Sequence, residues 1–385
     1  MNLNSRSGSW CSCFDFHRAK GNSVERRTLP GPDYFDPAIF ELDREQIFFR
    51  SWVMVGLSEQ AEKPGQWFRV DVVGESILIM RGQDMKLRGF YNVCRHRGSR
   101  LREEESGTEN GALACPYHDW CYSFEGALVA TPRVEKDEIN RDAHGLRPVH
   151  LDEWQGCVFV NLDRETPVSL REWIGNVNPD MLTYERYDMG SLRMTSKSEF
   201  VVEANWKIVI ENYCECLHCP SVHPELVELI PAYKTGWVFD PARDDGGVNS
   251  TSRNYGPATA ANIALMPTVS EDDANSVYGG TIFPNCFIDI AATGVVISQV
   301  MPVSATSTRI SSMYMFHPNS IAAPDFDAST LIAFSDMVTN QDNSVCERAQ
   351  RGVTSRSFAD GGVYPEKDEY VWQFNQQYLQ SRDAR

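Results

Sequence analysis

Two short pairs of cysteine and histidine constrain this chain more than any other feature of its sequence. Cys94 and His96 are separated by one residue, and after eighteen further residues Cys115 and His118 follow with two residues between them. Four such side chains could hold zinc tetrahedrally. Zinc sites, however, more often take both cysteines from one short segment and both histidines from the other. Pairs that each supply one thiolate and one imidazole favour a 2Fe-2S cluster, in which the cysteines bind one iron and the histidines the other.

The residues around these pairs predict a small all-β domain. Strand-like segments over residues 67–73, 76–80 and 87–93 alternate with glycine-containing turns and lead directly into Cys94. Short strands with this punctuation are typical of a small antiparallel barrel or sandwich. Residues 154–162 predict its closing strand.

A second group of candidate metal ligands lies in residues 211–224. Glu215 precedes His218 by three residues, so we expect the two side chains on one face of a helix. Pro220 cannot continue a regular helix, so the chain should bend and bring His223 round to a metal that His218 faces. Two imidazoles and a carboxylate from elsewhere form the facial triad of non-haem iron(II) oxygenases. A core helix with two hydrogen-bonded histidines is the alternative.

Further secondary structure is predicted by proline placement and by periodicity. Asp36 followed by Pro37 is typical of a helix start, because proline is favoured at the first helical position. Helices are also predicted over residues 327–351 and 368–379. Residues 236–280 are rich in small polar residues and fit a long active-site loop, because strand-like segments resume after them.

Composition limits the classes of function. The chain has 385 residues, 42% of them hydrophobic, which is enough for two domains with cores of their own. A net charge of −17 should repel nucleic acid and anionic membranes. Neither a membrane-spanning run nor a signal segment is evident, so we expect a soluble cytoplasmic protein. Several of the eleven cysteines lie in tight clusters with histidines, which favours metal-bound or structural thiols over disulfides.

Three segments resemble a known family. Residues 92–98 and 115–126 are similar to the two cluster loops of Rieske non-haem iron oxygenase large (α) subunits, and residues 29–379 as a whole resemble those subunits. The segment from Glu211 to Pro224 is most similar to the branch that oxidises quaternary ammonium compounds, which includes choline monooxygenase, carnitine monooxygenase and glycine betaine demethylase.

The chain departs from the family pattern at three positions. Asp119 stands where glycine is usual, although aspartate tolerates a left-handed backbone better than most residues do. Cys121 replaces a small residue, and a bystander thiol is the favoured interpretation. Leu217 replaces the tyrosine that is usual before the first iron histidine.

The resemblance implies an α+β fold with four parts. These are a flexible N-terminal arm over residues 1–26 and a helix over residues 27–50 that packs on the catalytic domain. A small all-β Rieske 2Fe-2S domain over residues 51–163 follows. The last part, residues 164–385, is a catalytic mononuclear iron domain with a central antiparallel sheet flanked by helices.

The resemblance also implies the roles of the candidate site residues. The cluster ligands would be Cys94, His96, Cys115 and His118. The ferrous ion would be held by His218, His223 and Asp342, with Asp336 as the alternative carboxylate. Glu215 would connect a cluster histidine of one subunit to an iron histidine of the next within a homotrimer.

The implied function is that of an oxidoreductase. As the oxygenase component, it would use O2 and electrons from a separate flavin and iron-sulfur NAD(P)H-dependent reductase to hydroxylate or N-demethylate a small quaternary ammonium compound. Glycine betaine, choline and carnitine-like molecules are the candidates. The alternatives are a ring-hydroxylating oxygenase acting on an aromatic or alicyclic acid, and an electron carrier with an inactive second site. Because aromatic faces attract cations, the candidate pocket residues are Tyr213, Trp237, Phe239, Tyr255, Tyr278, Phe283 and Phe287.

Overall fold

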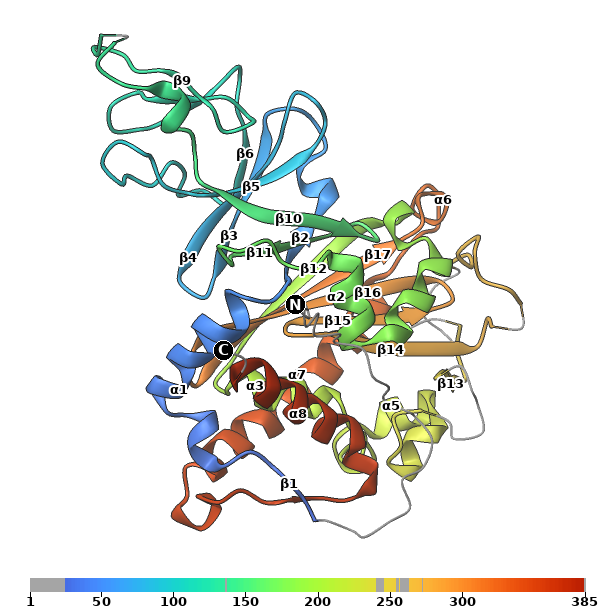
Figure 1. Cartoon of the computed structure of the whole chain (residues 1–385). Coiled ribbons are helices and arrows are strands. Elements are labelled where there is room, and N and C mark those ends of the chain that lie inside the picture. The colour runs from blue at the N-terminus through green and yellow to red at the C-terminus, as the bar shows by residue number, and fades with distance from the viewer. Residues whose placement is uncertain are drawn as a thin grey trace, which may run out of the picture.

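The computed structural model confirms the predicted α+β class and shows a β-rich lobe projecting from a larger body of sheet and helices (Figure 1). The residues that it describes are 25–135, 137–239, 246–253, 256, 263–271 and 273–383. Among them, no helix is both long and apolar enough to cross a membrane.

The β-rich lobe is built on a seven-stranded antiparallel sheet with the order β2-β11-β10-β5-β4-β3-β6. Its strands are β2 (Val53–Leu57), β3 (Gln66–Val72), β4 (Glu75–Arg81), β5 (Leu87–Tyr91), β6 (Ser106–Thr108), β10 (Pro148–Trp154) and β11 (Cys157–Asn161). A three-stranded sheet at the tip contains β7 (Leu113–Ala114), β8 (Cys121–Tyr122) and β9 (Leu128–Ala130). The predicted closing strand is β11, which pairs with both β10 and β2.

The body contains a six-stranded antiparallel sheet with the order β12-β17-β16-β15-β14-β13. Its strands are β12 (Arg193–Val202), β13 (Val248–Asn249), β14 (Ser276–Ile282), β15 (Cys286–Ala291), β16 (Gly294–Ser304) and β17 (Ser307–Phe316). Alternate residues of β15 enter different cores, because successive strand residues point to opposite faces. Ile288 packs with Ile174 of α2 (Leu170–Val177), whereas Phe287 packs with Ile208 of α3 (Trp206–Tyr213).

Helices cover the face of this sheet toward which Phe287 points (Figure 1). The longer ones, besides α3, are α7 (Ser329–Val353) and α8 (Glu369–Asp383), close to the predicted bounds. Four short helices are α1 (Pro37–Leu42), α4 (Cys219–Val222), α5 (Pro224–Leu229) and α6 (Pro318–Ile321). The single-turn and irregular helices are η1 (Gly31–Tyr34), η2 (Asp43–Phe48), η3 (Ser58–Ala61), η4 (Arg141–Ala143), η5 (Pro179–Tyr187), η6 (Met189–Ser191), η7 (Pro231–Thr235), η8 (Arg356–Phe358) and η9 (Glu366–Asp368).

The N-terminal segment packs on the catalytic body. Pro37 is the first residue of α1 as predicted, and Asp36 caps this helix by accepting a hydrogen bond from the Ala38 amide at 2.8 Å. Residues 1–24, which include most of the predicted arm, lie outside the described residues. The last residue of that arm, Arg26, lies in β1 (Arg26–Arg27), which pairs with β18 (Val363–Tyr364).

A buried polar cluster fastens this segment to α3 and α8. The carboxylate of Asp43 accepts hydrogen bonds from Trp206 Nε1 at 2.9 Å and from the Tyr378 hydroxyl at 2.7 Å, and it forms an ion pair with Lys207. Both members of this pair are fully buried. Because loss of one partner would leave an uncompensated buried charge, the cluster fixes how the three segments meet.

Another carboxylate, that of Glu211 on α3, should make the free energy of unfolding depend on pH. It accepts a hydrogen bond from the Tyr34 hydroxyl at 2.8 Å. Burial raises the pKa of Glu211 to about 8, although that hydrogen bond and the charge of Lys207 oppose the rise. The stability associated with the protonated form is fully present below the unfolded pKa, about 4.3, and is lost as pH rises through 8.

We therefore expect Glu211→Gln to become progressively more stable than the parent protein between pH 5 and pH 9. The difference should reach on the order of a few kcal/mol, because the neutral amide can still accept from Tyr34 and carries no buried charge. Urea unfolding of both proteins at several pH values measures it. Parallel pH profiles would show that Glu211 titrates normally.

Candidate functional site

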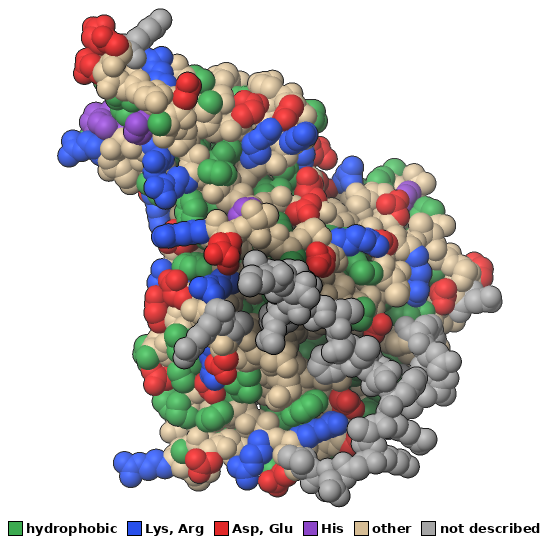
Figure 2. All heavy atoms as spheres, in the orientation of Figure 1, with side chains coloured by type: hydrophobic (Ala, Val, Ile, Leu, Met, Phe, Trp, Pro, Cys, Tyr) green, Lys and Arg blue, Asp and Glu red, His purple; other side chains and the backbone are tan. Residues whose placement is uncertain are grey.

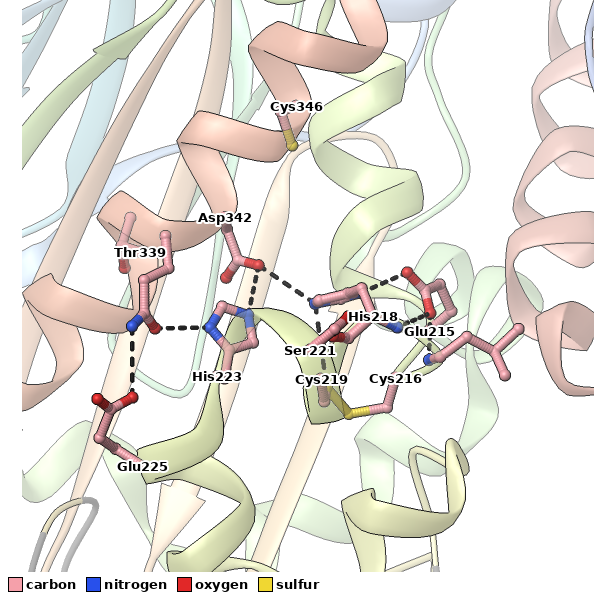
Figure 3. A network of polar contacts seen from close by, with 12 residues as sticks. Glu215, Cys216, His218, Cys219, Ser221, His223, Glu225, Thr339, Asp342 and Cys346 are labelled. Carbon is pink, nitrogen blue, oxygen red and sulfur yellow. Dashed lines mark hydrogen bonds and ion pairs between the residues drawn. A yellow bond between two sulfur atoms is a disulfide. The ribbon is translucent and has the colours of Figure 1, made fainter.

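Three side chains that commonly bind metals converge where α7 passes the segment after α3 (Figure 3). Asp342 Oδ1 lies 2.8 Å from His223 Nε2 and 3.2 Å from His218 Nε2. All three ligand atoms lie within 4.8 Å of one another. The His223 side chain is 1% exposed, whereas those of His218 and Asp342 retain 17% and 26% exposure. The cluster is therefore anchored on one side and accessible on the other.

The chain reaches this arrangement differently from the prediction. The helix α3 ends at Tyr213, so Glu215 and His218 do not share a helix face as expected. They nevertheless meet, because a tight turn brings the Glu215 carboxylate onto the amides of Leu217 and His218 and onto His218 Nδ1. Pro220 lies in the first turn of α4, where proline is tolerated, so the predicted bend does not occur at this residue. The helical path breaks instead at His223, which stands between α4 and α5.

Each histidine is oriented by a hydrogen bond to the nitrogen that points away from Asp342. His218 Nδ1 contacts Glu215, and His223 Nδ1 lies 2.8 Å from Gln341 Oε1. With Nδ1 as the donor, Nε2 of both rings keeps its lone pair for a metal. Two neutral imidazoles and one carboxylate fit Fe(II) with open coordination positions. Sequence reasoning missed Gln341, because a glutamine on a polar helix face carries no signal of its own.

The alternative carboxylate, Asp336, lies elsewhere. It accepts hydrogen bonds from the Tyr314 hydroxyl at 2.6 Å and from Ser198 Oγ at 2.9 Å. The structure thus brings Asp342, and not Asp336, to the two histidines.

Contacts within the three-residue cluster of His218, His223 and Asp342 shift the pKa values of its members. Burial lowers the pKa of His218, but its bonds to Asp342 and Glu215 outweigh burial and raise the pKa to about 9. Burial likewise opposes ionisation of Asp342, yet the two histidines hold the pKa of its carboxyl below the usual value. The site therefore stabilises positive charge beside a carboxylate, and a divalent cation can replace the proton.

The cysteines in this segment correct one expectation. Cys216 and Cys219 form a disulfide, although clustering with histidines had favoured free or metal-bound thiols. The residue between Cys216 and His218 is Leu217, which is 41% exposed. The bridged segment therefore presents an apolar side chain at the surface immediately before His218.

The second candidate centre lies at the tip of the β-rich lobe. Cys94 and Cys115 are buried in its core, and burial raises the pKa of the Cys94 thiol. The rings of His96 and His118 lie next to each other with centroids 4.5 Å apart. Figure 2 shows histidine side chains at the surface of this lobe, with basic side chains nearby. Sulfur atoms inside and imidazoles outside fit a cluster bound between two loops.

Aromatic residues support both cluster loops. Trp120 stacks on His96 at 4.6 Å with an interplanar angle of 6°. The Tyr122 hydroxyl lies 3.3 Å from Cys94 Sγ and accepts the Arg95 amide at 2.9 Å, a contact that sequence reasoning missed. Asp119, which stands where the family usually has glycine, adopts the left-handed backbone conformation with φ +59°.

The predicted aromatic pocket residues do not form one group. Tyr213 stacks on Phe287 with centroids 4.0 Å apart, on the α3 side of the sheet. Tyr278 is buried on the opposite side with Tyr184. The remaining described candidates are Phe283, which lies in the core, and Trp237 and Phe239, which pack on each other. Tyr255 lies outside the described residues.

Comparisons with known proteins agree with this architecture. Residues 184–382 match the family model for the ring hydroxylating alpha subunit (catalytic domain), and residues 51–150 match that for the Rieske [2Fe-2S] domain. The chain therefore belongs to the family of Rieske non-haem iron oxygenase α subunits, which are oxidoreductases. Its cofactors are accordingly a 2Fe-2S cluster and a mononuclear iron, and its co-substrate is O2.

Relatives within the family act on quaternary ammonium compounds. The glycine betaine monooxygenase oxygenase subunit of Chromohalobacter salexigens is 27% identical over 369 residues, covering 87% of this chain and 81% of that one. The carnitine monooxygenase oxygenase subunit of Escherichia coli is 25% identical over 342 residues, covering 89% and 88%. A solved quaternary ammonium Rieske monooxygenase shares the fold, with a TM-score of 0.76 at 23% identity over 93% of this chain and 95% of that one.

Two alanine variants distinguish the candidate carboxylates. We expect Asp342→Ala to lower the iron content from about three to about two atoms per chain, because only the mononuclear site loses a ligand. Asp336→Ala should retain all three and serves as the control. Iron analysis together with the visible spectrum of the cluster measures both. Loss of iron from Asp336→Ala instead would contradict the assignment.

Proposed function

We propose that this chain is the oxygenase component of an enzyme that hydroxylates or oxidatively N-demethylates a small quaternary ammonium compound. Glycine betaine, choline and carnitine-like molecules are the candidate substrates. The observation that carries the proposal is the convergence of His218, His223 and Asp342 beside Glu215, in a chain whose relatives oxidise such compounds.

Each site residue has a proposed role. Cys94, His96, Cys115 and His118 hold the 2Fe-2S cluster, and His218, His223 and Asp342 hold the ferrous ion. When bound, the cluster supplies electrons and the iron supplies the position at which O2 is activated. Glu215 and Gln341 fix the two imidazoles by accepting from Nδ1, so that both Nε2 atoms face Asp342.

The proposed reaction balances with two external electrons. One oxygen atom of O2 enters a C–H bond of the substrate, and the other leaves as water after two electrons and two protons have been supplied. On an N-methyl group, the resulting hydroxymethyl ammonium ion releases formaldehyde and a proton and leaves the demethylated tertiary amine. A separate NAD(P)H-dependent flavin and iron-sulfur reductase is the proposed electron source.

We also propose that the chain works as a homotrimer in which Glu215 connects the centres of neighbouring subunits. Within one chain, the tip of the β-rich lobe and the helices around the triad lie at opposite ends of the fold (Figure 1). Exposed apolar side chains lie beside both centres, Tyr117 next to His118 and Leu217 next to His218. Contact between them in neighbouring subunits would bring the two centres together.

A substrate panel tests the reaction. With reductase present, we expect glycine betaine, choline or carnitine to accelerate O2 uptake. Attack on an N-methyl group should release formaldehyde, whereas attack on the carbon that bears an alcohol group should consume O2 without releasing formaldehyde. Benzoate serves as the control, because it represents the alternative class of aromatic acids. O2 uptake with benzoate and with none of the amines would favour a ring-hydroxylating oxygenase.

Removing the charge of Glu215 tests its role. Glu215→Gln should keep full iron content and the cluster spectrum, yet lose about 10–100-fold in turnover, the range that such supporting partners commonly contribute. Glu347→Gln, which neutralises another carboxylate near α3, is the matched control. Rapid kinetics of cluster oxidation would locate the defect. Unchanged turnover in Glu215→Gln would remove the connection from the proposal.

A further inference from the structure

A disulfide lies directly beside the three-residue cluster (Figure 3). It joins Cys216 to Cys219, so the bridged segment contains His218 together with Leu217. The two cysteines are buried, with 4% and 3% exposure, whereas Leu217 between them is 41% exposed. The bond therefore lies just beneath the surface and fixes the backbone on both sides of a metal-binding histidine.

The sulfur of Cys219 lies close to the metal-facing nitrogen of His218. Cys219 Sγ is 3.9 Å from His218 Nε2, the same atom that lies 3.2 Å from Asp342 Oδ1. The backbone carbonyl of Cys219 also accepts the amide of His223 at 2.9 Å, so this residue contacts both histidines. With bond lengths of about 2.3 and about 2.0 Å, a sulfur and a nitrogen on one tetrahedral zinc ion are roughly 3.5 Å apart. A small shift would therefore bring the Cys219 sulfur onto the metal position.

The disulfide keeps this sulfur from acting as a ligand. Metals bind thiolates, whereas a sulfur atom in a disulfide carries no negative charge and is a poor ligand. With the bridge closed, the site offers three ligand atoms, from His218, His223 and Asp342. Three ligands leave positions open, as Fe(II) that reacts with O2 requires. A fourth ligand with a thiolate would complete the closed tetrahedron that is typical of zinc.

We infer that Cys219 is a latent fourth metal ligand and that its disulfide with Cys216 determines which metal the site takes. A dithiol reductant supplies two electrons and two protons, forms its own disulfide and leaves both cysteines as thiols. Cys219 then loses its proton as it binds the metal. The open site favours Fe(II), whereas the closed site favours Zn(II), which has no redox chemistry. The inference rests on the proposed assignment of His218, His223 and Asp342 as the iron ligands.

Two serine variants separate the role of the sulfur from that of the bridge. Cys216→Ser breaks the disulfide and leaves Cys219 as a free thiol. Cys219→Ser, the matched control, breaks the same disulfide but removes the sulfur next to His218. In each protein the 2Fe-2S cluster is kept, and a chelator exchanges the mononuclear iron for Co(II). A thiolate bound to cobalt gives an intense near-ultraviolet charge-transfer band, which difference spectra with and without cobalt separate from the cluster absorption.

We expect this band in Cys216→Ser and neither in Cys219→Ser nor in the parent protein. Zinc should bind Cys216→Ser about tenfold or more tightly than Cys219→Ser in competition with a chromophoric chelator, because only Cys216→Ser offers a fourth ligand. The parent protein should acquire the band after treatment with a dithiol that is removed before cobalt is added. This last measurement needs no variant, so it tests the inference even where a serine variant fails to fold.

Equal cobalt spectra and equal zinc affinities in the two variants would overturn the inference, because the disulfide would then have a structural role alone. A charge-transfer band in the parent protein before reduction would also overturn it, since the bridge would not withhold the sulfur. Both results leave the proposed reaction intact. Cobalt that binds the parent protein and Asp342→Ala equally well would instead refute the assignment of the three ligands on which the inference rests.

Discussion

The contact of Asp342 with both histidines depends on how α7 is held against α3. Asp342 and His223 are 119 residues apart in the chain, so no local structure joins them. Two turns beyond Asp342, the buried side chain of Gln350 provides the fastening. Its Oε1 accepts the amide of Asn205, which caps α3, at 2.8 Å, and its Nε2 donates to the Tyr34 carbonyl at 3.1 Å. One amide side chain thus links α7, the start of α3 and the N-terminal segment.

The helix α3 therefore has a structural end and a functional end. Its first turns carry Lys207 and Glu211, whose polar groups are satisfied by the N-terminal segment, and such buried networks are costly to disturb. Its last residue, Tyr213, faces the sheet through Asp289, and the chain then leaves the helix to form the turn around Glu215. Rigidity at one end allows the other end to present irregular backbone, where the Glu215 carboxylate can meet both backbone amides and an imidazole.

How much the sequence could predict depends on the distance over which each signal acts. Local spacing identified both Cys/His pairs and the two histidines near Pro220, because their ligands lie close together in the chain. The third carboxylate needed a family resemblance, since a helical aspartate such as Asp342 looks like a surface residue. The prediction that Glu215 and His218 share a helix face was wrong, because a tight turn can bring residues three apart together as well as a helix can. Gln341 and Gln350 gave no signal, because only tertiary contacts distinguish them from exposed glutamines.

Two carboxylates lie against the histidines of the three-residue cluster. Glu215 orients an imidazole and Asp342 faces two of them, so both negative charges stabilise positive charge at the metal position. These two charges make the position between the histidines favourable for a cation and unfavourable for a second anion, because like charges repel strongly where water is partly excluded. The same balance explains why the site needs two neutral imidazoles: each can offer a lone pair at Nε2 while a carboxylate supplies the charge.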